Sequence, residues 1–159
     1  MTTLFILMNV AFFGYTGFIT LKYGIQPSVS ESYYRLPRNL QWLFTIATWA
    51  YAIMAMTIGL ELTGNGLVFL AGSGICFVGV APAFHKLGME RTVHTVGALV
   101  GVAAMHLFII FEGYWYITLS FAVLSGLAFI VKWFYGKFIW WVEVFAFLSI
   151  VATYVLMLY

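Results

Sequence analysis

Apolar residues run along this chain in six long stretches that are separated by short polar links. The stretches cover residues 4–21, 40–60, 67–84, 93–111, 116–131 and 138–158. Each approaches the ~20 residues, or ~30 Å of helix, needed to cross the hydrocarbon layer of a bilayer. The strict alternation that marks a barrel strand is absent from the sequence. Because lipid offers the backbone no hydrogen-bond partners, the pattern predicts an all-α, polytopic membrane protein with six transmembrane helices.

The composition agrees with lipid as the main solvent. Hydrophobic residues make up 64% of the 159 residues and charged residues only 8%, whereas soluble domains carry about 25% charged residues. The net charge is +2, and no basic run suggests a nucleic-acid partner. We therefore expect residues 1–159 to form a single transmembrane domain whose main partner is the lipid bilayer.

The basic residues predict the orientation of this domain. All seven fall in the first, third and fifth links or at their borders: Lys22, Arg35, Arg38, Lys86, Arg91, Lys132 and Lys137. The alternate links, residues 61–66 and 112–115, contain no Lys or Arg. The positive-inside rule makes the basic side cytoplasmic and places both termini outside. The first stretch lacks the basic n-region of a signal peptide, so we expect it to be retained as a span.

The hairpin of residues 67–111 is predicted to be the packing core. It contains all three histidines and two pairs of small residues at a spacing of four, Gly79 with Ala83 and Gly97 with Gly101. Such pairs allow transmembrane helices to approach closely. We therefore expect the third and fourth helices to pack tightly.

Three hairpin side chains form a candidate metal site at the cytoplasmic face. They are His85, Glu90 and His94, with Glu90 and His94 on neighbouring positions of one helix face. Imidazole and carboxylate groups bind divalent metals, but this spacing is no established zinc signature. Structural hydrogen bonding is the alternative interpretation. Cys76, the single cysteine, lies too deep in the third stretch to join and is interpreted as a packing residue.

The first link, residues 24–39, is the only long one. Ser28 followed by Glu31 fits a capping box, so we expect a short helix that ends before Pro37. One interpretation is an interfacial connector. The other is part of a ligand site that opens to the cytoplasm. The predicted ligand-binding residues are Ser28, Ser30, Glu31, Arg35, His94 and Glu143.

Glu143 is a carboxylate inside a predicted span. It lies six residues beyond Lys137, roughly 9 Å along a helix. A charge within a span costs about 2.5–3.5 kcal/mol on insertion scales, so something must offset it. We expect a partner such as His94 or Lys86, protonation, or a water-filled cavity. Near the opposite face, the favoured interpretation of His106 is a histidine satisfied by helix packing, and an outer polar pair with Glu112 is the alternative.

Signatures of covalent catalysis and nucleotide binding are missing. The sequence has no G-x-S-x-G and no Asp to complete a Ser-His-Asp set. Phosphate-binding loops and dinucleotide fingerprints are absent as well. The sequence therefore predicts no catalytic residue, leaves any cofactor unknown, and leaves open whether the protein is an enzyme.

Four segments carry a resemblance to known proteins: residues 27–34, 74–82, 93–98 and 139–143. They resemble small polytopic membrane proteins of Bacteroidetes bacteria and their phages, for which no activity is assigned. The resemblance implies a bacterial or phage origin and little else. We separately expect the chain to lie in the bacterial inner membrane. A looser similarity is to ceramidase and progestin-receptor-like membrane hydrolases. Their Asp and paired-histidine helix are missing here, so no residue is carried over.

Three functional hypotheses follow. The leading one is an integral inner-membrane protein that binds a small ligand or lipid from the cytoplasmic leaflet, or acts as a subunit of a membrane assembly, including a homo-oligomer. The second is a metal-dependent intramembrane hydrolase that uses His85, Glu90 and His94. The third is a proton-linked transporter or channel in which Glu143 titrates.

Overall fold

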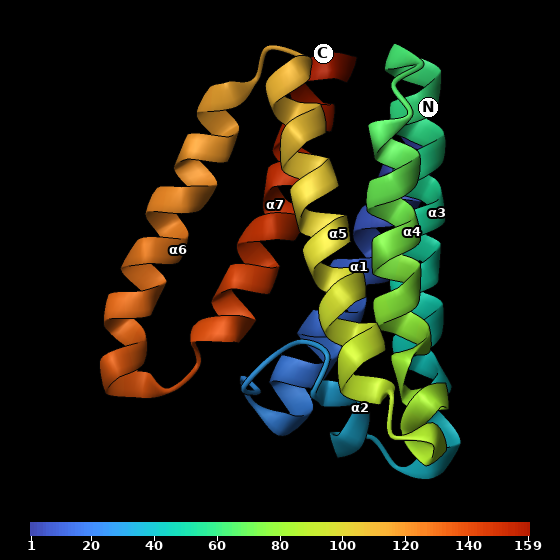
Figure 1. Cartoon of the computed structure of the whole chain (residues 1–159), viewed down its shortest axis with the longest axis vertical. Coiled ribbons are helices and arrows are strands. Elements are labelled where there is room, and N and C mark those ends of the chain that lie inside the picture. Colours follow the sequence, from blue (N-terminus) through green and yellow to red (C-terminus); the bar gives the residue numbers. More distant parts are fainter.

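The computed structural model is all-α, as the sequence predicts (Figure 1). It describes the side chains of residues 1–131 and 136–159. Seven α-helices occur in the described chain, joined by two 3₁₀ segments: α1 (Thr2–Tyr23), α2 (Ser32–Arg35), η1 (Arg38–Leu40), α3 (Trp42–Thr63), α4 (Leu67–Val80), η2 (Ala81–Leu87), α5 (Glu90–Phe111), α6 (Trp115–Tyr135) and α7 (Phe138–Leu158). Every predicted apolar stretch thus lies in a helix, and the short helix predicted in the first link is α2.

Five helical segments of the described chain are long and apolar enough to cross a membrane, which is typical of a membrane protein. They are Thr2–Tyr23, Arg38–Thr63, Leu67–Leu87, Glu90–Phe111 and Phe138–Leu158. The described apolar part of α6, Trp115–Val131, is shorter than these five. The count of six spans therefore stays a prediction.

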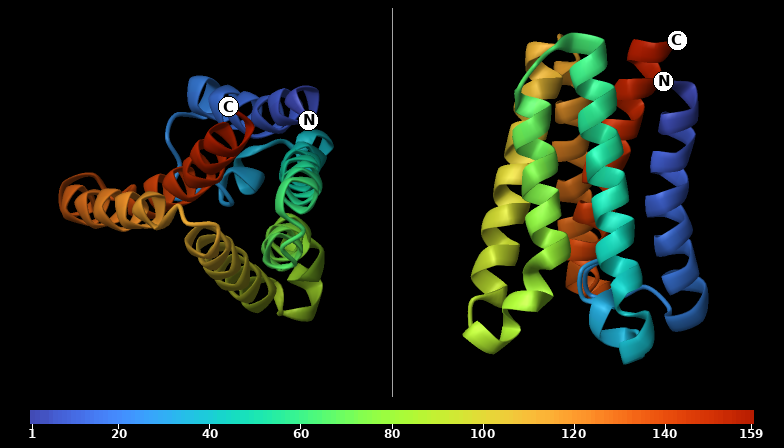
Figure 2. Two further views of the ribbon diagram at one scale, coloured as in Figure 1. Left: turned by 90° about the horizontal axis from the view of Figure 1, so that it is seen from above. Right: turned by 90° about the vertical axis from the view of Figure 1, so that its right-hand side faces the viewer.

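Consecutive helices lie side by side around the bundle. Helix α1 packs on α3, α3 on α4, and α4 on α5, while α7 lies between α5 and α1. Seen from above, α6 projects to one side of this group and is in contact mainly with α7 (Figure 2). Both termini lie at the same end of the bundle (Figure 2), so the chain enters and leaves at the end opposite α2.

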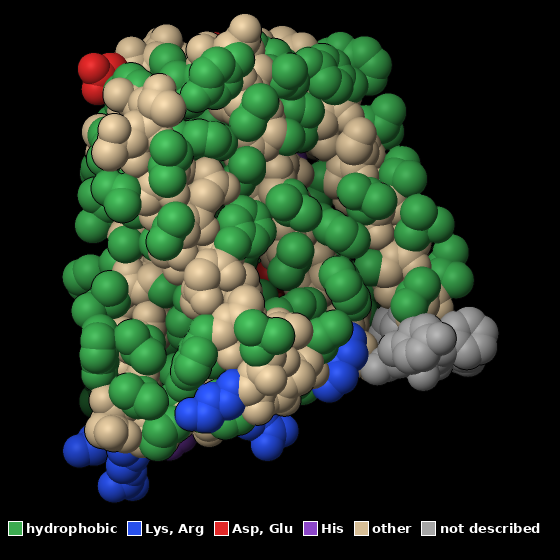
Figure 3. All heavy atoms as spheres, turned by 180° about the vertical axis from the view of Figure 1, so that it is seen from behind, with side chains coloured by type: hydrophobic (Ala, Val, Ile, Leu, Met, Phe, Trp, Pro, Cys, Tyr) green, Lys and Arg blue, Asp and Glu red, His purple; other side chains and the backbone are tan. Residues whose placement is uncertain are grey.

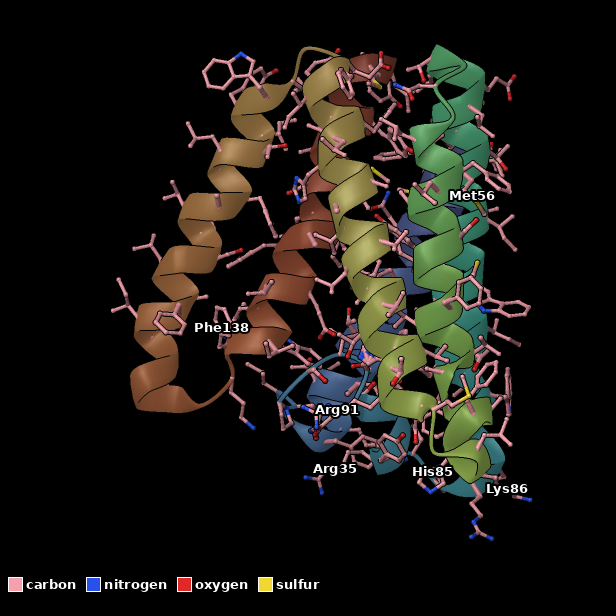
Figure 4. All side chains as sticks on the ribbon, viewed as in Figure 1. Arg35, Met56, His85, Lys86, Arg91 and Phe138 are labelled. Carbon is pink, nitrogen blue, oxygen red and sulfur yellow. The ribbon has the colours of Figure 1, made fainter. Side chains whose placement is uncertain are left out.

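The basic side chains gather at one end of the bundle. On the face shown in Figure 3, Lys and Arg gather at one end, and the middle of the bundle is covered by hydrophobic side chains. Arg35, Lys86 and Arg91 lie together at this end (Figure 4). The side chain of Lys132 lies outside the described residues. The fold thus has a basic end, with both termini at the other.

The closest helix contact is between α4 and α5 and depends on glycine. A Cβ built on Gly74 would lie only 2.6 Å from the Gly97 carbonyl oxygen, and it would also meet the Gly101 backbone. The predicted tight packing through Gly97 and Gly101 is therefore present. The partner on α4 is Gly74, however, because Gly79 faces α3, where a Cβ would lie 2.9 Å from the Thr48 hydroxyl.

Helix α4 ends earlier than the apolar pattern predicts. The α-helix stops at Val80, and a 3₁₀ segment continues through Pro82, which has no N–H to donate to the fourth residue before it. The Ala81 N–H donates to the Val78 carbonyl instead. Across the interface, the Thr45 hydroxyl donates to the Gly79 carbonyl at 2.8 Å. The 3₁₀ segment η2 therefore lies at the basic end of the bundle, and His85 lies within it.

The most deeply buried large side chains come from the predicted hairpin and from the helices packed around it. Phe12 of α1, Tyr51 of α3, Phe108 of α5 and Tyr154 of α7 are at most 2% exposed. The Tyr154 hydroxyl donates to the Ala55 carbonyl at 2.7 Å, and the Phe12 and Phe147 rings stack at 3.7 Å. The predicted hairpin is therefore part of the core, through its glycine contact and buried side chains such as Phe108. The core extends beyond it to α1, α3 and α7, whose aromatic side chains complete it.

Candidate functional site

The link after α1 folds back against the basic end of the bundle. The Glu31 N–H donates to the Ser28 hydroxyl at 3.0 Å, which is the predicted half of a capping box. A turn follows, and helix α2 begins at Ser32 and ends before Leu36. The tight turn points the Val29 N–H and the Ser30 hydroxyl toward the helices.

Two helices hold this link in place. The Trp140 N–H at the start of α7 donates to the Pro27 carbonyl at 3.1 Å. On the other side, the hydroxyls of Tyr15 on α1 and Ser32 on α2 lie 2.6 Å apart, and Ser32 is fully buried. Because buried hydroxyls need partners, these bonds fix the link as a structured part of the bundle.

Glu143 on α7 binds the backbone of this link. The Val29 N–H donates to Glu143 Oε2 at 2.5 Å, and the Ser30 hydroxyl makes a longer contact of 3.4 Å with Oε1. The expected partners His94 and Lys86 are not the ones that contact the carboxylate directly. Charge-assisted bonds from backbone N–H groups offset the cost of burying a carboxylate. Glu143 thus anchors the link to α7.

His94 on α5 joins the same network through Ser30. His94 Nε2 lies 2.9 Å from the Ser30 hydroxyl, and the Ser28 hydroxyl lies 3.0 Å from it. Ser30 has one proton to share among Glu143, Ser28 and His94, so the donor at the His94 contact is set by the tautomer of the imidazole. The other ring nitrogen, Nδ1, is buried and has no hydrogen-bond partner among the described residues. His94, Ser30 and Glu143 therefore form a continuous chain of polar contacts.

A cavity of about 450 Å³ opens above this chain at the basic end. We call it the polar pocket. Its lining residues come from the first link, α3, α4, η2 and α5: Ser28, Ser30, Glu31, Tyr34, Phe44, Val78, Ala81, Pro82, Glu90, Arg91 and His94. The structure thus brings together four of the predicted ligand-binding residues, and Glu143 lies directly beneath them.

A second, narrower cavity of about 70 Å³ lies between α4, α5 and α7. We call it the apolar slot. It is lined by Ile75, Val78, His94, Ala98, Gly101, Val102, Met105, His106, Glu143, Ala146, Phe147 and Ile150. His94 and Val78 line both cavities.

Arg35 does not line the polar pocket. Its Nε donates to the Gln26 side chain at 3.0 Å, and Figure 4 shows it at the outer edge of the basic end. The geometry gives Arg35 a role in the shape of the first link. Its predicted contact with a ligand stays a prediction.

Two of the three predicted metal ligands meet. His85 Nδ1 lies 2.5 Å from Glu90 Oε2, with the His85 side chain 75% exposed. His94 is directed to Ser30 instead. Within the described side chains, no group of three or more His, Cys, Asp or Glu is arranged to hold a metal ion. The geometry gives no support to the hydrolase hypothesis, which stays a prediction.

His106 and Glu112 have separate partners, in agreement with the favoured interpretation of His106 as a packed histidine. Glu112 accepts a hydrogen bond from the Asn65 side-chain amide at 2.8 Å. His106 Nδ1 lies 3.2 Å from the Thr118 hydroxyl, and its ring stacks on Phe121. The turn after α3 and the arrival of α6 decide these partners, which the spacing of His106 and Glu112 alone does not reveal.

Comparisons with known proteins give no match. No protein family, curated protein or solved structure matches this chain. The function proposed below therefore rests on the geometry of the site.

Among the polar side chains that line the polar pocket, sequence reasoning missed two, Tyr34 and Arg91. Arg91 had a usable signal, because it precedes His94 by three positions on α5 and so shares a helix face with it. Tyr34 had none, since its position depends on how the first link folds back.

Proposed function

We propose that this chain is a bacterial inner-membrane protein with six spans, its basic end in the cytoplasm and both termini outside. In that position it binds a small ligand or lipid that enters from the cytoplasmic leaflet. The positive-inside rule supports the orientation. The end that carries Arg35, Lys86 and Arg91 is then at the level of the cytoplasmic head groups (Figure 4).

The observation that carries the proposal is the polar pocket itself. It has a volume of about 450 Å³, within the usual range of small-molecule sites. Its wall presents hydroxyl, carboxylate, guanidinium and imidazole groups beside apolar side chains from α3 and α4. Convergent polar groups in a concave site are the general mark of ligand binding.

The first link gives this pocket a fixed wall. Its backbone is held to α7 by the Glu143–Val29 and Trp140–Pro27 contacts and to α5 by the His94–Ser30 contact. A wall that is already fixed loses little conformational entropy when a ligand binds. The same contacts explain why an intramembrane carboxylate is present without requiring it to bind the ligand.

The test is retention of small molecules during purification. Wild-type protein and the His94→Ala variant are purified in mild detergent, and released lipids and metabolites are identified by mass spectrometry. We expect species that wild type retains to be lost from His94→Ala, since His94 lines both cavities.

The matched control is Thr95→Ala, an exposed neighbour on the same helix. It should keep the wild-type set of bound species, and size-exclusion chromatography checks that all three proteins are folded. An identical set in all three would contradict the proposed site.

A further inference from the structure

The polar pocket carries two opposite charges that come from different elements. Glu31 belongs to the first link and Arg91 to the first turn of α5, and both residues line the cavity. Among the side chains that the structure describes, the one ion pair joins His85 and Glu90. Within this part of the chain, the Glu31 carboxylate and the Arg91 guanidinium are therefore not neutralised by an ion pair.

Glu90 lines the same pocket but already has a partner. Its Oε2 lies 2.5 Å from His85 Nδ1, and its side chain is only 19% exposed. A ligand that paired with Glu90 would first have to displace His85. Glu31 and Arg91 are exposed, so a ligand has only water to displace from them. They are the two charges of the pocket that are most readily available to a ligand.

Opposite charges in one pocket select against a ligand that carries a single charge. An ammonium group is attracted by a carboxylate and repelled by a guanidinium, and a like charge placed in a binding site lowers affinity. A molecule with both an amine and an acidic group forms charge-assisted hydrogen bonds with both side chains. The planar guanidinium of arginine also matches a carboxylate or phosphate in a bidentate arrangement.

The rest of the wall suits a compact, partly apolar molecule. Phe44, Val78, Ala81 and Pro82 supply an apolar surface, and the Ser28 hydroxyl supplies a neutral polar group. The volume of about 450 Å³ lies in the lower half of the range of small-molecule sites, about 300–1,000 Å³. The pocket therefore fits a ligand whose two charged groups are joined by a short uncharged part.

We propose that the polar pocket binds a small zwitterion with one amine and one acidic group. The amine lies against the Glu31 carboxylate, the acidic group against the Arg91 guanidinium, and the uncharged part against Phe44 and Val78. This inference rests on the proposed function, because it names the ligand class for the same site. Two sources carry this chemistry, namely free amino acids and the serine or ethanolamine head groups of membrane lipids.

The experiment measures binding to the full-length protein in an uncharged maltoside detergent. The probes are the common L-amino acids, glycerophosphoserine and glycerophosphoethanolamine, which are ranked by the rise in unfolding temperature and then titrated by calorimetry. We expect at least one zwitterion to bind. Tightest binding by an amino acid identifies a free source, and tightest binding by a glycerophospho compound identifies a lipid head group. No binding of any probe would overturn the proposal.

Two analogues of the tightest probe test the need for both charges. One lacks the amine, and in the other the acidic group is blocked as an amide or ester. Each should bind about tenfold more weakly than the probe, the effect of losing roughly 1.4 kcal/mol of binding. Equal binding of either analogue and the probe would show that one charge suffices and would contradict the zwitterion.

Two variants assign each charged group to its partner. Glu31→Gln should weaken the tightest probe about tenfold and leave the amine-free analogue unchanged. Arg91→Gln should weaken the probe to a similar extent and leave the acid-blocked analogue unchanged. The control variants Glu61→Gln and Arg38→Gln remove exposed charges outside the pocket and should bind the probe as wild type does. Equal loss of binding in controls and pocket variants would overturn the assignment.

The outcomes distinguish this inference from the proposed function. If no zwitterion binds but His94→Ala loses co-purified species, the ligand class is wrong and the proposed function stands. If that loss is absent as well, both are wrong.

Discussion

At the scale of single residues, Glu143 shows how an intramembrane carboxylate can serve architecture. Its oxygens accept from the Val29 N–H and the Ser30 hydroxyl, so the buried carboxyl group is matched by donors from a link more than a hundred residues away. The hydrogen bonds of His94 and Ser30 depend on the same arrangement. The Glu143 side chain on α7 thereby holds in place the part of the first link that lines the base of the polar pocket.

Replacing Glu143 with alanine should destabilise the protein by about 1–3 kcal/mol, since the buried Val29 N–H then loses its acceptor. Glu143→Gln should cost less, because its amide oxygen still accepts from Val29. Unfolding by heat or by titrated denaturing detergent measures both. Glu61→Ala, an exposed acid on α3, is the control and should be neutral. Equal stability of Glu143→Ala and wild type would contradict the anchoring role.

At the scale of elements, the interface of α4 and α5 is a contact between backbones. Gly74 lies against Gly97 and Gly101 so closely that no side chain fits between them. Where lipid removes the hydrophobic drive for helix association, this kind of close approach supplies van der Waals contact instead. The interface also orients α5 so that the face carrying His94 and Arg91 lies toward the polar pocket.

Gly74→Ala should therefore separate the two helices and cost about 1–3 kcal/mol, as overpacking of a tight interface does. Gly126→Ala on α6 is the matched control. A Cβ at Gly126 meets nothing within 4 Å, and alanine is the better helix former, by about 0.5–1 kcal/mol. Equilibrium unfolding of both variants gives the comparison. A neutral Gly74→Ala would mean that α4 and α5 do not pack as described.

At the scale of the whole molecule, the fold places its basic residues and its termini at opposite ends. The polar pocket opens at the basic end, beside Arg91, and the buried aromatic core lies deeper, between α1, α3, α5 and α7. Rigid packing and ligand access are thus separated along the bundle axis. The proposed orientation decides which compartment supplies the ligand.

Cysteine labelling tests that orientation in a Cys76→Ser background. A membrane-impermeant maleimide should label Glu61→Cys in intact spheroplasts, because the link after α3 is expected outside. Lys86→Cys should be labelled only after the membrane is opened, since basic links stay in the cytoplasm. The reverse labelling pattern would show that the protein has the opposite orientation, with the polar pocket at the outer face of the membrane.

The helices and their membrane character follow from sequence alone. Apolar runs of about 20 residues with at most one internal charge can satisfy their backbones in lipid only as helices, which is why the predicted stretches fall almost entirely in α-helical or 3₁₀ segments. The capping pair of Ser28 and Glu31 was predictable for the same local reason. So was the use of Gly97 and Gly101 as a contact surface.

Only the tertiary structure decided which residues meet. The partner of Glu143 is a backbone N–H in the first link, and no sequence spacing encodes a contact between residues 29 and 143. The same holds for His94. The sequence placed it both with His85 and Glu90 in a metal set and with Ser30 in a ligand set, and the fold directs it to Ser30. Local patterns act over one or two helical turns, whereas the site depends on how α5, α7 and the first link pack together. The sequence determined six apolar helical stretches with a basic side, and the packing of those helices made a pocket there.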